Sequence, residues 1–437
     1  MTDRALAYLD EVGVGEAGPA WLDMRRKAAR ASFADAGFPH RRIEAWRYTD
    51  LARLLDKTMW KAAEPETGAI LPPEGRVNPF GGIESWKLIF VNGFFRADLS
   101  DIGGLPSGVE LTSLGKALAS GTKFESIFDA AGPEAIGPLA ALNAACVRDG
   151  AVIRVKPGVS VEKPVELIHY TTRGEGQASH LRHVIELGAG ASLTLLEAQI
   201  GWGGHYLADR FMQVSLEDSA TLTHVRLQDE DVRAVHLTTL LGEIEAGANY
   251  LATTLALGGR VGRMQTAIRF KGEGANAVSN TAYLLRGDQH LDTTIVADHA
   301  VPACESAAQS KGVLDGQSTG VFQSKVIVAP GAQRSDARQM SNALLLSRDA
   351  AMNAKPELEI YADDVQCAHG STIGELDDDA LFYLRSRGIE EAMARRLLIS
   401  AFLAEVLEQI PEELGRDQLL ARAQDWFETD AEEGGKP

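Results

Sequence analysis

A repeat of 27 to 29 residues runs through the middle of the chain and limits its fold more than any other feature. The segments GAGASL, EDSATL, EAGANY and GEGANA superimpose on four shared alanines, Ala191, Ala220, Ala248 and Ala275. One unit of this length cannot bury its apolar face alone, but stacked units bury theirs against one another. The repeat therefore predicts a solenoid.

Apolar residues flank the shared alanines at fixed distances. Four positions before them lie Leu187, Leu216 and Ile244, whereas Lys271 breaks the pattern and has Phe270 beside it. Two positions after the alanines lie Leu193, Leu222, Tyr250 and Ala277. Each unit therefore reads as a strand, a tight turn of small residues and a second strand.

The region 180–340 contains no pattern of helix length, which argues against a parallel α/β sheet and leaves a β-helix or a β-sandwich. The steady period favours the β-helix. We predict a mainly β fold with helical regions at both ends. Its expected parts are an N-terminal helical region and linker at 1–84, a mixed segment at 85–149, a β-helix core at 150–370 and a C-terminal helical domain at 371–437.

The N-terminal third predicts helices, a linker and one hairpin. Helices are expected over 20–36, where Gly37 and Pro39 follow, over 41–55 and within 112–146; residues 61–84 are rich in proline and glycine. The run WKLIFVNGFFR at 86–96 has Asn92-Gly93 at its centre, a strong signal for a hairpin turn.

The C-terminal segment predicts three helices, the first ending at Gly388, the second from Glu390 to Ile410 and the third over 413–427. The second carries two apolar stripes, Met393, Leu397, Ala401 and Ala404 in one and Leu398, Phe402, Val406 and Ile410 in the other. This apolar face is wider than a surface helix needs. Packing against the neighbouring helices explains part of it, and a docked partner is the alternative.

Composition narrows the function. A net charge of −18 argues against nucleic-acid binding, because a surface that follows phosphates needs clustered Lys and Arg. The three cysteines, Cys146, Cys304 and Cys367, are too few and too widely spaced for a disulfide framework. Without a signal-peptide pattern or an apolar run of about 18 residues, the sequence predicts a cytoplasmic protein. Phosphate-loop and zinc-protease motifs are missing from the sequence.

One short segment, DDVQCAHG at 363–370, has chemistry of its own. Cys367 and His369 are two residues apart, so on a strand both side chains project from one face. A thiolate and an imidazole are both metal ligands. A buried cysteine beside a histidine that caps a turn is the simpler alternative. Because a cluster held by thiolates usually takes four ligands, this pair needs donors from a second chain.

The same segment carries a family resemblance. The stretch CAHGSTIGELDDDALFYLRSRGI at 367–389 and the upstream EAWRYTDL at 44–51 resemble motifs of the SufB/SufD family, scaffold proteins of the SUF iron–sulfur cluster assembly machinery. Where SufB proteins carry Glu-His-Glu-Ala, this sequence reads Cys367-Ala368-His369-Gly370, which favours the SufD branch. Ala368 and Ser371 stand where Ser and Ala are common in the family. The resemblance covers nearly the whole chain.

The resemblance implies a right-handed parallel β-helix and a non-catalytic scaffold role. It implies a heterodimer with SufB, with a homodimer of the isolated chain left open, and a transient iron–sulfur cluster at the subunit interface. His369 matches the family histidine that takes part in cluster formation, and Cys367 matches a neighbouring position. The C-terminal helices are expected to bind the SufC ATPase, with Phe382, Tyr383, Arg385, Leu398, Phe402 and Val406 as candidates. The family complex also binds reduced flavin (FAD), although this sequence has no flavin motif.

Two enzyme classes with related folds are alternatives. A carbohydrate-active β-helix enzyme, such as a polysaccharide lyase, needs charged residues clustered on one solenoid face. Asp288, Asp292 and Asp298 are the candidates for such a cluster. A hexapeptide-repeat acyltransferase needs a strict apolar period of six residues, which this sequence lacks.

Overall fold

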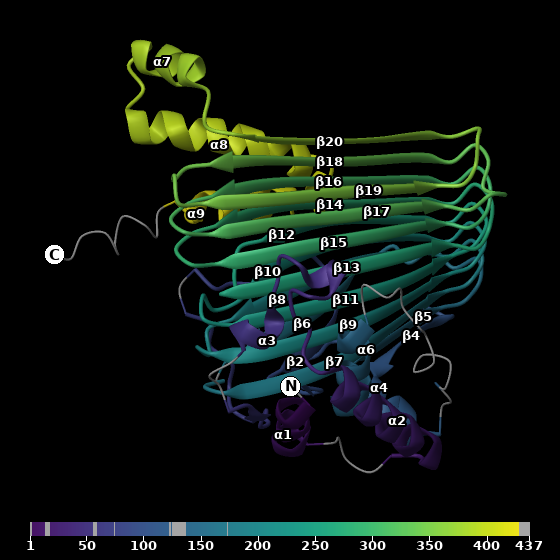
Figure 1. Cartoon of the computed structure of the whole chain (residues 1–437). Coiled ribbons are helices and arrows are strands. Elements are labelled where there is room, and N and C mark those ends of the chain that lie inside the picture. The colour runs from purple at the N-terminus through teal and green to yellow at the C-terminus, as the bar shows by residue number, and fades with distance from the viewer. Residues whose placement is uncertain are drawn as a thin grey trace.

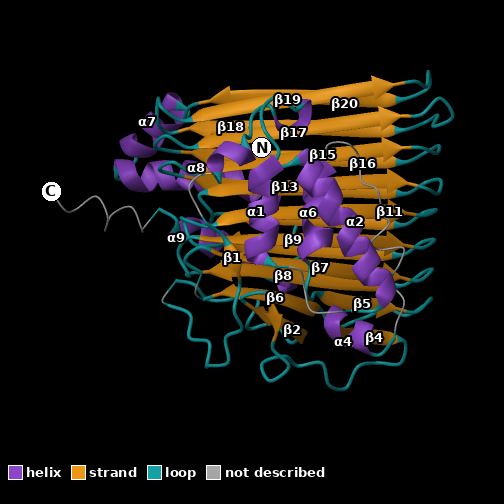
Figure 2. Cartoon of the chain, turned by 60° about the horizontal axis from the view of Figure 1, so that its bottom comes forward, coloured by secondary structure: helices purple, strands orange, loops and turns teal. Residues whose placement is uncertain are grey.

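The chain forms a β-solenoid built from two facing sheets (Figure 1, Figure 2). The computed structural model describes residues 2–13, 18–55, 59–73, 75–121, 124, 137–172 and 174–427. From β5 onward, consecutive strands alternate between the sheets, and each pairs in parallel with the strand two positions along. This winding confirms the solenoid and rules out the β-sandwich, whose sheets are antiparallel.

Neighbouring strands within each sheet are hydrogen-bonded to one another. The first sheet contains β19 (Ala351–Ile360), β17 (Thr319–Val328), β15 (His290–His299), β13 (Val261–Phe270), β11 (Val235–Ile244), β9 (Tyr206–Leu216), β7 (Gln177–Leu187), β5 (Ala151–Val155) and β4 (Val109–Ser113), with β1 (Lys61–Ala62) beside β7. The second sheet contains β20 (Gln366–Gly374), β18 (Asp336–Leu345), β16 (Glu305–Leu314), β14 (Asn276–Leu285), β12 (Asn249–Ala256), β10 (Thr221–Asp229), β8 (Ser192–Gly201), β6 (Val165–Thr171), β2 (Trp86–Val91) and β3 (Phe94–Phe95).

The four alanines of the repeat form one column at the corner between the sheets. Each is buried and directly precedes a strand of the second sheet. The carbonyl oxygen of Ala191 accepts from the Thr221 amide at 2.9 Å, and the same bond recurs from coil to coil. Cys304 and Ser335 continue the column higher up, where their carbonyls accept in the same way. A small buried side chain therefore occupies this corner in six successive coils.

The irregularity at Lys271 is a single inserted residue. Phe270 pairs with Ile244 in the first sheet and takes the inward position expected for the repeat. The turn that follows, from Phe270 to Ala275, is one residue longer than the turn from Ile244 to Ala248. Lys271 thus lies outside the repeat, where its amine pairs with Glu243 at 3.2 Å.

Helices of the N-terminal region cover the outer face of the first sheet (Figure 2). They are α1 (Thr2–Val12), α2 (Ala20–Ala36), η1 (Glu44–Trp46), α3 (Leu51–Leu54), α4 (Leu114–Ala119) and α6 (Gly137–Cys146). The helix at 20–36 and the hairpin at Asn92-Gly93 are confirmed; there Phe90 pairs with Phe95. The helix expected within 112–146 is present as α4 and α6, and residues 122–123 and 125–136 lie outside the described part.

The single helix predicted over 41–55 is wrong. Only η1 and α3 are helical there, and Arg47 to Asp50 form turn and coil between them. The reason is tertiary, because Trp46 and Thr49 turn inward to contact the solenoid.

The C-terminal helices are α7 (Asp378–Ser386), α8 (Glu391–Leu407), η2 (Glu412–Leu414) and α9 (Arg416–Asp425). The Asp377 side chain caps α7 by accepting from the Asp379 and Ala380 amides at 2.9 and 3.1 Å. Helix α8 packs on the outer face of the second sheet, and α7 stands away from it (Figure 1). Among the described residues, no helix is long and apolar enough to cross a membrane.

The sheets extend beyond the range 150–370 predicted for them. Strands β2 and β4, at 86–91 and 109–113, already belong to the second and first sheet, and β20 runs to Gly374. The mixed segment thus forms the first part of the solenoid.

Candidate functional site

Cys367 and His369 lie on β20, the last strand of the second sheet. In register, Cys367 pairs with Ala337 and His369 with Gln339 on β18, and both partners are buried. Both side chains therefore project from the inward face of β20. Cys367 is half-buried against the solenoid core, whereas His369 is exposed.

The end of the solenoid is open at this pair. Within the described part of the chain, β20 pairs with β18 alone and β19 with β17 alone. Most residues of both strands are exposed or half-buried, unlike those of the inner coils. Two edge strands with unpaired backbone groups and two metal-ligand side chains thus lie on the same end of the molecule. Such edges are templates for pairing with another chain.

The thiol of Cys367 is held in its neutral form. Partial burial raises its pKa, and the nearby Asp336 carboxylate acts in the same direction, while a backbone hydrogen bond from Ala337 opposes them. A cysteine must lose its proton to bind a metal, so a positive ion or a partner chain has to favour the thiolate here.

Two donors do not make a metal centre. Among the described residues, no group of three or more His, Cys, Asp or Glu side chains is arranged to hold a metal ion. The other two cysteines lie elsewhere: Cys304 belongs to the corner column, and Cys146 is buried on α6. Burial raises the pKa of Cys146 to about 12.

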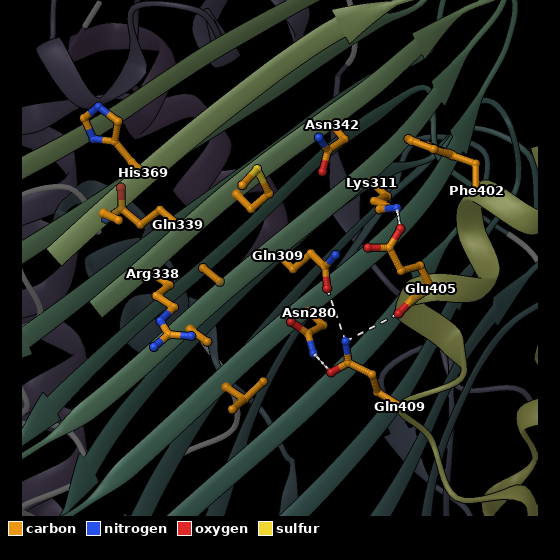
Figure 3. Close-up of a pocket in the computed structure, with 15 residues that line it drawn as sticks. Asn280, Gln309, Lys311, Arg338, Gln339, Asn342, His369, Phe402, Glu405 and Gln409 are labelled. Atoms are coloured by element: carbon orange, nitrogen blue, oxygen red, sulfur yellow. Dashed lines mark hydrogen bonds and ion pairs between the residues drawn. The ribbon is translucent and has the colours of Figure 1, made fainter. Parts of the chain in front are cut away.

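A groove of about 730 Å³ lies between the outer face of the second sheet and α8, and Gln339 and His369, whose side chains project from the opposite face of their strands, lie at its end away from α8 (Figure 3). Polar side chains tie α8 to the strands across it. Lys311 on β16 pairs with Glu405, and the Gln409 carboxamide bonds Asn280 at 2.7 Å and Gln309 at 3.2 Å. Helix α8 is thereby fixed to β14 and β16.

The C-terminal helices expose an apolar surface, formed by Phe382 and Tyr383 on α7 and Met393 and Leu397 on α8. These side chains are 73%, 57%, 47% and 45% exposed. We call these four residues the α7–α8 surface. Arg385 lies beside it and pairs with Glu391 at 3.3 Å.

The second apolar stripe of α8 faces the solenoid instead. Val406 is fully buried against the second sheet, so its assignment to a docking surface is corrected. Phe402 is half-buried beneath the Lys311 amine, 4.6 Å from its ring centre, and Leu398 is half-buried. The sequence showed both apolar stripes of α8 but not which one faces the strands. In the first stripe, Met393 and Leu397 are exposed.

A buried polar cluster inside the lower coils was missed from the sequence. Glu197 accepts from His224 Nε2 at 3.0 Å and from Arg226 Nε at 2.8 Å. Arg210 Nη1 donates to Glu230 at 3.0 Å, and the Glu230 carboxylate lies 2.6 Å from His236 Nδ1. The alternation of side chains along each strand places these residues on the inward face. Inward residues are expected to be apolar, so the sequence pattern did not predict the buried ion pairs.

The motif EAWRYTDL anchors the N-terminal region to the first sheet. Arg263 on β13 lies over the Trp46 ring and donates to the Ala45 carbonyl at 2.9 Å. It also pairs with Asp292 on β15, to which the Thr49 hydroxyl donates. The motif therefore has a structural role.

The aspartates offered for a carbohydrate-active site do not converge. Asp288 pairs with Arg260 at 3.4 Å, Asp298 with Arg269 at 3.5 Å, and Asp292 is buried with Arg263. Each carboxylate is thus matched to an arginine of the neighbouring coil, which does not favour a lyase.

Comparison with known proteins gives one answer over almost the whole chain. Residues 169–402 match the family model "SUF system FeS cluster assembly, SufBD core domain", and residues 13–167 match "SufBD protein N-terminal region". The iron–sulfur cluster assembly protein SufD of Escherichia coli is 31% identical over 394 residues, 88% of each chain. SufD of Bacillus subtilis is 28% identical over 65% of each chain. A SufBD family protein of Mycobacterium tuberculosis is 33% identical over 62% of this chain and 69% of its own length.

Proposed function

We propose, because this chain belongs to the SufBD family of the SUF iron–sulfur cluster assembly system, that it is a SufD-type scaffold subunit. It takes part in building iron–sulfur clusters and does not turn over a substrate by itself. One observation carries the proposal: two ligand-capable side chains, Cys367 and His369, lie together at an open end of the solenoid, and no third donor joins them in the described part of the chain. Such a pair is incomplete until another chain supplies ligands.

The partner in this proposal is a SufB-type subunit of the same fold. The edges of β19 and β20 offer unpaired backbone groups to its strands, and pairing there brings its side chains to His369. The nascent cluster is then cargo bound between the subunits, with His369 as a ligand or proton-handling group. A homodimer of the isolated chain uses the same edges.

The second partner is a SufC-type ATPase, which we assign to the α7–α8 surface. Phe382, Tyr383, Met393 and Leu397 give it aromatic and apolar contacts, and Arg385 lies at the rim. Exposed aromatics of this kind are typical anchors of protein interfaces. Since β20 leads through α7 into α8, and α8 is tied to β14 and β16, we expect movement of the helices on ATP hydrolysis to reach the strands beside His369.

We propose flavin binding only for the assembled complex, not for this chain alone. The GxGxxG match at 13–18 follows helix α1 and not a strand, so we assign the flavin no residues of this chain and derive no step through it. The proposed location is the cytoplasm, where the free thiols stay reduced.

The test of the site is His369→Ala in the complex purified with its native partners. We expect unchanged subunit composition but a loss of most of the cluster formed on the complex, followed by iron and sulfide analysis and visible absorption. His205→Ala, a half-exposed histidine on another coil, is the matched control and keeps the yield. Normal cluster formation by His369→Ala removes His369 from the site. Recovery of neither an ATPase nor a related solenoid by co-purification contradicts the scaffold role.

A further inference from the structure

The carboxamide of Gln339 lies beneath His369 with one polar end unused. The residue is 2% exposed, and its Oε1 has no hydrogen-bond partner among the described residues. Its Nε2 lies 3.5 Å from the Glu357 carbonyl oxygen, which orients the donor end toward β19 and leaves the oxygen as a free acceptor. Buried acceptors without a partner are rare and call for a functional or structural explanation.

Gln339 and His369 are neighbours in the sheet. They are register partners on β18 and β20, where parallel strands lie about 4.8 Å apart, so their side chains project together from one face. Both lie at the end of the groove away from α8, and Figure 3 shows the Gln339 side chain next to that of His369. Side chains of register partners on adjacent strands are close enough for an imidazole nitrogen to bond a carboxamide oxygen.

The polar groups that line the groove against α8 lie on the opposite face of the sheet and are engaged elsewhere. Arg338 carries only donors and binds Asp336 at 3.0 Å. Gln309 Oε1 already accepts from Gln409, and Glu405 pairs with Lys311. Gln339 Oε1 is thus a buried, unengaged oxygen on the strand next to the histidine.

We infer that Gln339 is a positioning residue for His369, an inference that rests on the proposed role of this histidine. A neutral imidazole has one N–H and one lone pair, and only the lone pair binds a metal. When Gln339 Oε1 accepts the N–H, it fixes the tautomer and directs the other nitrogen toward the open end, where the partner and the cluster iron lie. Partners of this kind commonly raise metal affinity or activity by about 10- to 100-fold.

The first test is the tautomer of His369 in the isolated, full-length chain labelled with ¹⁵N-histidine, with His369→Gln used for assignment. We expect one dominant tautomer in the wild type. Gln339→Met, which keeps the length but removes the acceptor, populates both tautomers, and Gln339→Glu, which keeps an acceptor oxygen, restores a single one. Gln309→Met is the matched control, because it removes a carboxamide from the same groove away from His369, and it leaves the signals unchanged.

The second test measures cluster formation on the complex. We expect Gln339→Met to reduce the cluster yield about tenfold at unchanged subunit composition, and Gln339→Glu to restore most of it. A His369 spectrum that is identical in the wild type and Gln339→Met overturns the inference, as does a full cluster yield from Gln339→Met. The two proposals fail separately: normal cluster formation by His369→Ala rejects the proposed site, whereas the tautomer measurement does not depend on clusters.

Discussion

The guanidinium carbon of Arg263 lies 3.8 Å from the ring centre of Trp46, so a strand of the first sheet and the N-terminal motif share one buried contact. Both side chains are fully buried. We expect Trp46→Ala to lower the free energy of unfolding by about 3–5 kcal/mol, because it leaves a large cavity and uncovers a buried cation. Denaturant unfolding measures this. Arg47→Ala, at an exposed neighbour, is the control and stays within about 0.5 kcal/mol; equal stability of both variants contradicts the anchoring role.

The buried histidines make stability depend on pH below neutrality. Burial lowers the pKa of His183 to about 4, and burial likewise lowers the pKa of His299 to about 4. The unfolded chain binds these protons near pH 6.5, whereas the folded chain does not. Their contribution is therefore fully present above about pH 6.5 and is lost as the pH falls toward 4, by up to about 1.4 kcal/mol per pH unit for each histidine.

Denaturant unfolding between pH 7.5 and 4.5 checks this dependence. We expect His183→Gln to have a shallower slope than the wild type over that range, because one titrating group is removed. A wild-type stability that stays constant from pH 6.5 to 4.5 refutes the prediction.

The three cysteines differ in their reaction with iodoacetamide. Cys367 is half-buried and the other two are buried, so Cys367 is alkylated first in the folded chain. Because burial raises its pKa, it still reacts more slowly than the same thiol in urea. Peptide mass spectrometry gives the order, and earlier labelling of Cys146 or Cys304 speaks against the placement. Pairing with a SufB-type subunit at β20 further protects Cys367.

Phe382 and Val406 separate binding from stability. We expect Phe382→Ala to weaken binding of the proposed ATPase partner by about 2 kcal/mol, a loss of about thirtyfold in affinity. The free energy of unfolding should not change. Val406→Ala instead lowers the free energy of unfolding by about 1–3 kcal/mol, since it leaves a cavity against the second sheet. Met24→Ala on α2 is the control, because Met24 is 67% exposed and lies in the N-terminal region, outside the C-terminal helices. Calorimetry and thermal unfolding distinguish the effects; unchanged affinity of Phe382→Ala excludes that residue from the contact.

Regular stacking is why the solenoid could be predicted from the sequence. Every coil places the same kind of residue at the same corner, so Ala191, Ala220, Ala248 and Ala275 repeat visibly, and Cys304 and Ser335 replace alanine only in the higher coils. The insertion beside Phe270 obscured the period but not the fold, because a solenoid accepts an extra residue in a turn without changing the strand register.

Contacts between distant segments could not be predicted in this way. The sequence shows apolar positions on α8 but not that Val406, rather than Leu397, meets the strands. It shows helix-forming residues at 41–55 but not that Arg263 and Asp292, more than 200 positions away, draw Trp46 and Thr49 out of a helix. Cys367 and His369 were found because their spacing alone places them on one face of β20. Gln339 was not, since only the strand register brings it beside His369.

The open coil at β19 and β20 also affects how well the protein resists degradation in a cell. Its last strands have one neighbour each, so among the coils above β7 this one forms the fewest backbone bonds and frays first. A second subunit that occupies those edges closes the weakest point and adds its binding free energy to folding. Under the proposed pairing, copies made in excess of the partner stay frayed at this coil, and we expect proteases to remove them first, which would match the numbers of the two subunits.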